Sequence, residues 1–219
     1  MKRIVMKHLA LSVAAAALLS GALTACVPLV LGGAVGGVMI ANDRRTSGAQ
    51  LEDEGIELRA LSRIRSNVGE RVHVNLTSYN RQVLLTGEVP NAQDRQLVEQ
   101  IVSRVENVTS VVNELAVMGH SSLRDRSSDT LVTGNVKARL LDARDLQSNA
   151  FKVVTERGTT YLMGRVTQRE ANRATEVVRG TTGVQKVVRI FEVISEEELA
   201  HKQPAPARPQ PAAAKPAGS

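Results

Sequence analysis

Two stretches decide the fold: VLLTGEV at residues 83–89 and TYLMGRV at residues 160–166. Each has an apolar run followed by glycine, one variable position and valine, and the second begins 77 residues after the first. A further pair, NVTSVVN at 107–113 and GVQKVVR at 183–189, repeats at a distance of 76 residues. Self-similarity over such a distance indicates two copies of one structural unit.

Each copy predicts the same first helix. Asp53 in the first copy and Asp129 in the second are residue types that cap helix N-termini, and we expect the helices to begin after them. Apolar residues then recur at the spacing of one helix face. These residues are Ile56, Ala60 and Ile64 in the first copy, and Val132, Val136 and Leu140 in the second.

Two strands, a second helix and a last strand complete each copy. Short β-rich runs bounded by turn residues predict the strands 72–78, 83–89 and 109–118, and then 151–156, 159–166 and 185–194. Gly87 and Gly164 lie late in the second strands, where a missing side chain lets another element approach closely. The expected fold class is α+β: two tandem αββαβ domains at 51–119 and 127–195, each a three-stranded mixed sheet with two helices on one face.

The N-terminus has the pattern of a bacterial lipoprotein signal. Residues 1–25 combine a basic start with an apolar run that is too short to span a bilayer. The run ends in Leu23-Thr24-Ala25-Cys26, and Cys26 is the only cysteine in the chain. This order of residues predicts a diacylglyceryl group on Cys26, cleavage before it, and an N-acyl (palmitate) chain on the new N-terminus. The alternative is a free, buried cysteine.

The regions that flank the two domains predict little packed structure. Residues 26–50 are expected to form the lipidated cysteine and a flexible, glycine-rich leader, and the Pro/Ala-rich residues 203–219 are expected to be a disordered tail. Because Val27 rather than aspartate follows Cys26, lipoprotein sorting predicts the outer membrane, with the chain lipid-anchored on its periplasmic face.

Composition argues against several functional classes. The chain has 28 basic and 22 acidic residues, and removing the three basic residues of 1–25 leaves 25 minus 22, or +3. With two Tyr, two Phe and no Trp, this charge does not predict a nucleic-acid partner. His73 and His120 have no spaced ligand partners, and no catalytic set can be assembled, so we expect neither a metal, a cofactor nor an enzyme.

The repeat resembles the BON domain. The residues that carry the resemblance are Leu162-Met163-Gly164-Arg165-Val166 and the Gly183-Val184-Gln185-Lys186-Val187 lead-in to the last strand. Two such domains behind a lipobox, together with the segment 42–48, are similar to outer-membrane lipoproteins of this family. The resemblance implies a non-enzymatic protein that supports envelope integrity and gathers at cell division sites. It also implies the β-barrel assembly machinery as a partner.

The first helix of the second domain is the candidate site. Leu131, Gly134, Ala138 and Leu141 form a second apolar stripe on it, with Lys137 and Arg139 on the same helix. An apolar stripe beside basic residues suits anionic phospholipid, such as phosphatidylglycerol or cardiolipin. The family resemblance implies the same function for this helix and adds Asn135 to its surface. Alternatively, the stripe packs against the other copy.

A second functional class stays open at this point. The chain could instead be a periplasmic protein-binding adaptor or chaperone-like factor that holds envelope proteins at sheet edges or between the two copies. Dependence of vesicle binding on anionic lipid and on salt distinguishes the two functions.

Overall fold

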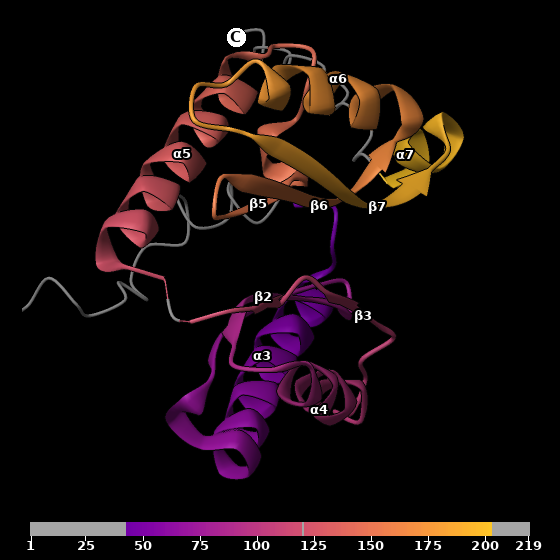
Figure 1. Ribbon diagram of the computed structural model, residues 1–219. Helices are drawn as coiled ribbons and strands as arrows, with labels where there is room; N and C mark the ends of the chain where they lie inside the picture. Colours follow the sequence, from indigo (N-terminus) through magenta and orange to yellow (C-terminus); the bar gives the residue numbers. More distant parts are fainter. Residues whose placement is uncertain (1–42, 120, 203–219) are drawn as a thin grey trace, which may run out of the picture. The chain divides into compact units, whose positions relative to one another are not determined.

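The structure of the chain is a computed structural model, which describes residues 43–119 and 121–202. Two αββαβ units follow one another along the chain (Figure 1). The first unit contains α3 (Ser47–Val68), β1 (His73–Tyr79), β2 (Gln82–Val89), α4 (Ala92–Ser103), β3 (Ser110–Asn113) and β4 (Ala116–Val117). The second contains α5 (Leu123–Asp142), β5 (Lys152–Glu156), β6 (Thr159–Thr167), α6 (Gln168–Arg179) and β7 (Lys186–Ile194), and the short helix α7 (Glu196–Lys202) follows it.

Both units have a mixed sheet with the same topology. The central strands β2 and β6 pair antiparallel with β1 and β5, to which they are joined by tight turns. On their other side they pair parallel with the last strand of the unit. A parallel pair needs a crossover connection, and α4 and α6 provide it. The expected α+β class and the αββαβ order are confirmed.

The first sheet departs from the expected three strands, because its last strand is divided into β3 and β4. The pairing register is the same on both sides of the break: Leu85 pairs with Asn113, and Glu88 pairs with Ala116. The break lies opposite Gly87, whose φ of 112° departs from strand geometry. In the second unit β7 pairs with β6 without interruption.

Gly87 and Gly164 lie where the backbone is crowded, as the sequence predicts. A Cβ atom on Gly87 would collide with the carbonyl oxygen of His73, and one on Gly164 would collide with the carbonyl oxygen of Ala150. These contacts bring the central strand of each unit against its neighbouring segment. A larger residue at either position would have to displace backbone rather than a flexible side chain.

The first helices begin earlier than the sequence predicts. Thr46 caps α3, and Ser122 caps α5 in a capping box with Asp125. Asp53 and Asp129 are interior, buried residues of these helices, so the prediction that they are N-caps is wrong. The leader was expected to extend to residue 50, but helix α3 already includes residues 47–50.

Asp53 and Asp129 instead hold the turns between the strands. The Asp53 carboxylate accepts hydrogen bonds from the backbone N–H groups of Asn80 and Arg81, at 2.7 and 2.8 Å. In the second unit, the Asp129 carboxylate accepts hydrogen bonds in the same way from the backbone N–H groups of Arg157 and Gly158. The residues of the two turns, Asn80, Arg81, Arg157 and Gly158, have φ values between 49° and 70°. The three that are not glycine adopt this conformation at a cost. Each aspartate compensates that cost by satisfying two turn N–H groups.

Each unit has its own hydrophobic core between its helices and one face of its sheet. A third cluster joins the units through the opposite sheet faces and contains Tyr79, Leu84, Tyr161, Met163 and Ile190. Side chains alternate between the two faces of a strand, which explains why consecutive residues of β2 and β6 belong to different clusters. The two units therefore contact each other through their sheets.

Candidate lipid-binding helix

Local signals define where α5 begins. The Ser122 hydroxyl accepts a hydrogen bond from the Asp125 backbone N–H, and the Asp125 carboxylate accepts one from the Ser122 backbone N–H. The hydrogen bonds that Ser122 donates lower the pKa of Asp125, so its carboxylate is charged at neutral pH. A negative charge in the first turn also stabilises the helix dipole.

One face of α5 fixes how the helix is turned. Val132, Val136 and Leu140 are buried in the core of the second unit, in one cluster with residues of α6, β5 and β6. On the same face, the Asp129 carboxylate accepts hydrogen bonds from the backbone N–H groups of Arg157 and Gly158 at 2.7 and 2.9 Å. Four anchored positions over three turns leave α5 no freedom to rotate. The opposite face is therefore presented outward.

The outward face carries the apolar stripe that the sequence predicts. Leu131 and Leu141 are 70% and 71% exposed, and Gly134 and Ala138 are exposed between them. A Cβ atom on Gly134 would have no heavy atom within 4 Å. Within the described part of the chain, this stripe does not pack against the first unit, so that alternative is contradicted.

Leu123 extends the stripe and was missed by the sequence analysis. It is 80% exposed and lies 18 residues, or about five full turns, before Leu141, so that both point to the same side. Its spacing could have revealed it, had the helix been predicted to start at Ser122 rather than after Asp129. Three exposed leucines therefore follow one side of α5 over nearly its whole length.

The basic residues beside the stripe are not neutralised. Lys137 and Arg139 are exposed, as is Arg144 just beyond the helix, and among the described residues none of the three side chains has a hydrogen bond or ion pair. Arg173 of α6, in contrast, is paired with Asp145 at 2.9 Å. Asn135 is also exposed. All seven residues predicted to contact lipid therefore lie on the accessible surface of α5.

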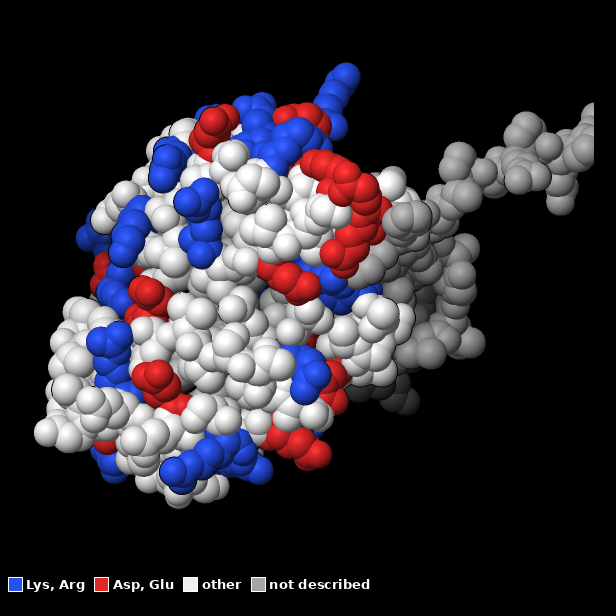
Figure 2. All heavy atoms as spheres, turned by 90° about the vertical axis from the view of Figure 1, so that its right-hand side faces the viewer, with Lys and Arg blue, Asp and Glu red and all other residues white. Residues whose placement is uncertain are grey.

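Elsewhere the surface charge is mixed. On the face shown in Figure 2, basic and acidic side chains are interspersed over most of the surface, and one curved band of acidic side chains lies at the upper right. In the residues that the structure describes, no helix is long and apolar enough to cross a membrane. Cys26 and the other residues of the predicted leader, up to residue 42, lie outside the described residues, as do the predicted tail and His120.

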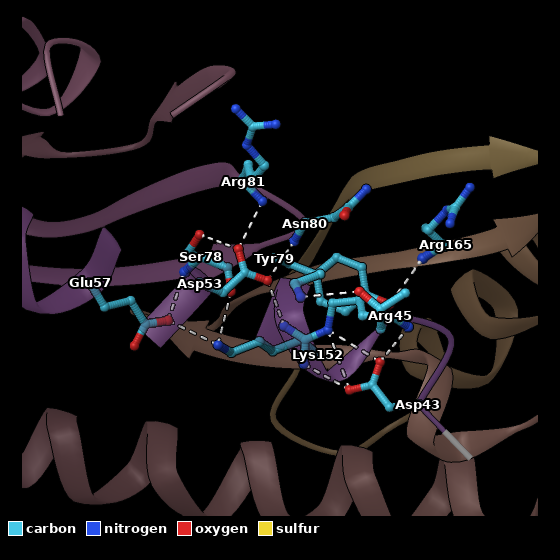
Figure 3. A network of polar contacts seen from close by, with 12 residues as sticks. Asp43, Arg45, Asp53, Glu57, Ser78, Tyr79, Asn80, Arg81, Lys152 and Arg165 are labelled. Atoms are coloured by element: carbon cyan, nitrogen blue, oxygen red, sulfur yellow. Dashed lines mark hydrogen bonds and ion pairs between the residues drawn. The ribbon is translucent and has the colours of Figure 1, made fainter. Parts of the chain in front are cut away.

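A polar network around residues 43–46 was also missed (Figure 3). Arg45 donates to the carboxylates of Asp43 and Asp53, both at 2.8 Å, and its guanidinium stacks on the ring of Tyr79 at 4.4 Å. Arg44 pairs with Glu170 of the second unit at 2.7 Å, and both side chains are more than nine-tenths buried. The sequence resemblance included these residues, but only the fold shows that they connect both units.

Comparison with known proteins agrees with this architecture. The BON domain profile matches residues 52–119 and 128–195. The chain is 33% identical to "Outer membrane lipoprotein DolP" of Haemophilus influenzae over 191 residues, which are 86% of this chain and 97% of the relative.

Two further relatives are more distant. The "21 kDa hemolysin" of Actinobacillus pleuropneumoniae is 29% identical over 69% of this chain and 79% of its own length. "Osmotically-inducible protein Y" of Escherichia coli is 29% identical over 52% of this chain and 58% of its own length. With two matched domains and a relative of nearly equal extent, the chain belongs to the BON-domain family and is a dual BON-domain, DolP-like protein.

Proposed function

We propose that this envelope-associated protein is a non-enzymatic outer-membrane lipoprotein that supports envelope integrity by binding anionic phospholipid through α5. The observation that carries the proposal is the row of exposed leucines, Leu123, Leu131 and Leu141, beside the unpaired cations Lys137 and Arg139. An exposed apolar row marks a contact surface, and the cations beside this one favour a membrane interface, which offers acyl chains to the leucines and phosphates to the cations.

Magnitudes favour a reversible contact. Burial of one leucine side chain contributes about 1.5–3 kcal/mol, and each basic residue near an anionic surface contributes about 1 kcal/mol. The helix loses little conformational freedom on binding, since its buried face is already fixed by the core of the second unit. Together these terms allow α5 to bind a membrane surface while remaining free to leave it.

Lipidation explains how α5 meets its ligand. In the proposed function, acyl chains on Cys26 hold the protein at the periplasmic face of the outer membrane, where α5 binds anionic phospholipid. Support comes from the lipobox around Cys26 and from the relative named as an outer-membrane lipoprotein. Labelled palmitate should be incorporated by the wild-type protein and not by Cys26→Ala. Equal incorporation by both proteins would contradict this assignment.

Vesicle flotation tests the lipid site. The chain from Asp43 onward should float with vesicles that contain phosphatidylglycerol or cardiolipin, and not with neutral vesicles. Leu131→Glu should abolish flotation, because it removes apolar area and adds a negative charge. The matched control is Leu58→Glu on α3, whose leucine is equally exposed at 71%. Circular dichroism should show that both variants keep the fold.

Two outcomes would contradict the lipid site. If the wild-type protein does not float, the membrane contact comes from lipidation alone, and the protein is better described as a protein-binding adaptor in the envelope. If Leu131→Glu floats as well as the wild-type protein, the lipid contact lies elsewhere than on α5. Binding to the β-barrel assembly machinery and recruitment to division sites stay predictions from the family resemblance.

A further inference from the structure

The first unit also exposes an apolar helix face, on α3. Leu51 and Leu58 are 69% and 71% exposed, and small residues alternate with them along the same face. The full row is Gly48, Leu51, Gly55, Leu58, Ser62 and Arg65, with spacings of 3, 4, 3, 4 and 3 residues. This is the spacing of the seam of a coiled coil. No described residue packs over these leucines, and the lipid-binding proposal does not use them.

We infer that this face of α3 binds α3 of a second copy of the chain, with the two helices antiparallel. The seam has small residues at one set of positions and large residues at the other. When two such helices are antiparallel, each large residue can face a small one. A two-fold axis near residues 56 and 57 places Leu58 opposite Gly55, Leu51 opposite Ser62 and Arg65 opposite Gly48 of the second copy. Both copies then use the same surface, as a closed dimer requires.

The small residues let the two backbones approach. Helices pack with their axes 8–10 Å apart, and the distance depends on the side chains between them. Only the side chain of Arg59 lies over Gly55, and its guanidinium would come within 2.9 Å of an added Cβ. That guanidinium is 38% exposed and is paired with the Glu52 carboxylate, an exposed ion pair of a kind that contributes little to stability. Leu58 of the second copy reaches the backbone at Gly55 when Arg59 moves out of this ion pair.

Charge selects the antiparallel direction. The exposed acidic residue Glu54 lies in the first half of the seam, and Arg65 lies at its end. Neither side chain has a hydrogen bond or ion pair within the described chain. Antiparallel helices bring the acidic half of each copy beside the basic half of the other, and they put Glu54 of one copy and Arg65 of the other on the same flank of the seam. Parallel helices in register would instead place Arg65 opposite Arg65.

The equivalent face of α5 does not have these properties. It has leucines at both ends, small residues at its centre, and the unpaired cations Lys137 and Arg139 at its flanks. Two copies of this face would place leucine opposite leucine, and their cations would repel. The repeat has therefore produced two equivalent helices with different surfaces: α5 fits an anionic surface and α3 fits itself.

The size of the contact predicts its strength. The seam from Gly48 to Arg65 covers 18 residues, or about 27 Å of helix. One helix pair of this length lies at or below the lower end of stable interfaces, which bury roughly 1,200–2,000 Å². Association should therefore be weak in solution and stronger between copies held on the same membrane, where their effective concentration is high.

Cross-linking tests both the partner and the direction. The chain from residue 26 onward with Cys26→Ser has no thiol, so single cysteines can be introduced without background. Leu51→Cys and Ser62→Cys chains, mixed and treated with a short bismaleimide, should give a covalent dimer. Either chain alone should give much less, because the introduced cysteines of the two copies would lie 11 residues, or about 16 Å, apart along the helix axis. The matched control is Leu131→Cys mixed with Ser62→Cys.

The reaction should be run in solution and with both chains held on nickel-chelating vesicles through an N-terminal hexahistidine tag. Leu58→Glu, added to both chains, should reduce the dimer yield at least fivefold, and Leu131→Glu should leave it unchanged. The proposal is overturned if the mixed pair gives no more dimer than its controls on vesicles, or if Leu58→Glu has no effect. Because flotation depends on Leu131 and dimerisation on Leu58, failure of one proposal leaves the other standing.

Discussion

The carboxylate of Asp129 accepts a hydrogen bond from the backbone N–H of Arg157 at 2.7 Å, which joins the middle of α5 to the turn between β5 and β6. Asp53 has the same relationship to the turn of the first unit. A residue type that usually begins a helix is used here to hold a turn 28 residues away. Loss of the carboxylate leaves backbone N–H groups without a partner in a buried place.

Asp129→Ala should therefore lower the free energy of unfolding by about 2–4 kcal/mol, since two charge-assisted hydrogen bonds are lost together. Urea unfolding followed by circular dichroism measures the change. Asp142→Ala, at the exposed end of the same helix, is the control and should stay within about 0.5 kcal/mol of the wild-type protein. Equal stability of both variants would show that the turn does not depend on Asp129.

Two glycines should respond in opposite directions to alanine. Gly164→Ala should destabilise the protein by about 1–3 kcal/mol, because the new Cβ would collide with the carbonyl oxygen of Ala150. Gly134→Ala should stabilise it by up to about 1 kcal/mol, because the site is open and alanine favours the helix. Thermal unfolding of the two variants checks this pair. A stabilising Gly164→Ala would show that β6 can move away from residue 150.

Stability should decrease in acid, in part because of Glu170. Burial by itself would raise the pKa of Glu170, but the hydrogen bonds from Arg44 and from the backbone of Thr167 hold it below its ordinary value of 4.5. A lowered pKa stabilises the folded state above the ordinary pKa, and this contribution is lost as the pH falls through the folded-state value.

The variant Glu170→Gln should therefore have a lower Tm than the wild-type protein at pH 7, and the difference should shrink at pH 3. Thermal unfolding between these pH values gives the comparison. Glu176→Gln, which changes an exposed carboxylate 3.9 Å from Arg173, should show almost no difference at either pH. A constant difference for Glu170→Gln would exclude protonation of this carboxylate as the cause.

The basic residues of α5 should set the salt dependence of lipid binding. Replacing both Lys137 and Arg139 by glutamine removes about 2 kcal/mol of attraction to an anionic surface, which is roughly a 30-fold loss of affinity. The loss should be smaller in high salt, where the wild-type attraction is already screened. Titration with phosphatidylglycerol vesicles at two salt concentrations measures both effects. Arg173→Gln, which removes a cation already paired with Asp145, is the control.

Local sequence was sufficient for the architecture. The repeated pattern around Gly87 and Gly164 predicted two units, the order of their elements and the close approach at both glycines. The helical spacing of Val132, Val136 and Leu140 predicted which face of α5 is buried. Such patterns succeed because the periods of helices and strands are properties of the backbone, which hold wherever the segment lies.

The remaining features depended on residues that are distant in the sequence. Asp53 and Asp129 have the local signature of N-caps, and only the position of the turns shows that they bond elsewhere. The sequence also could not decide whether Leu131 is exposed, because an apolar stripe fits either a second domain or a membrane. The sequence by itself determined the repeat and its inner faces. The tertiary structure decided that the sheets pack together through Tyr161 and Met163, which leaves the outer faces of α3 and α5 free to bind other surfaces.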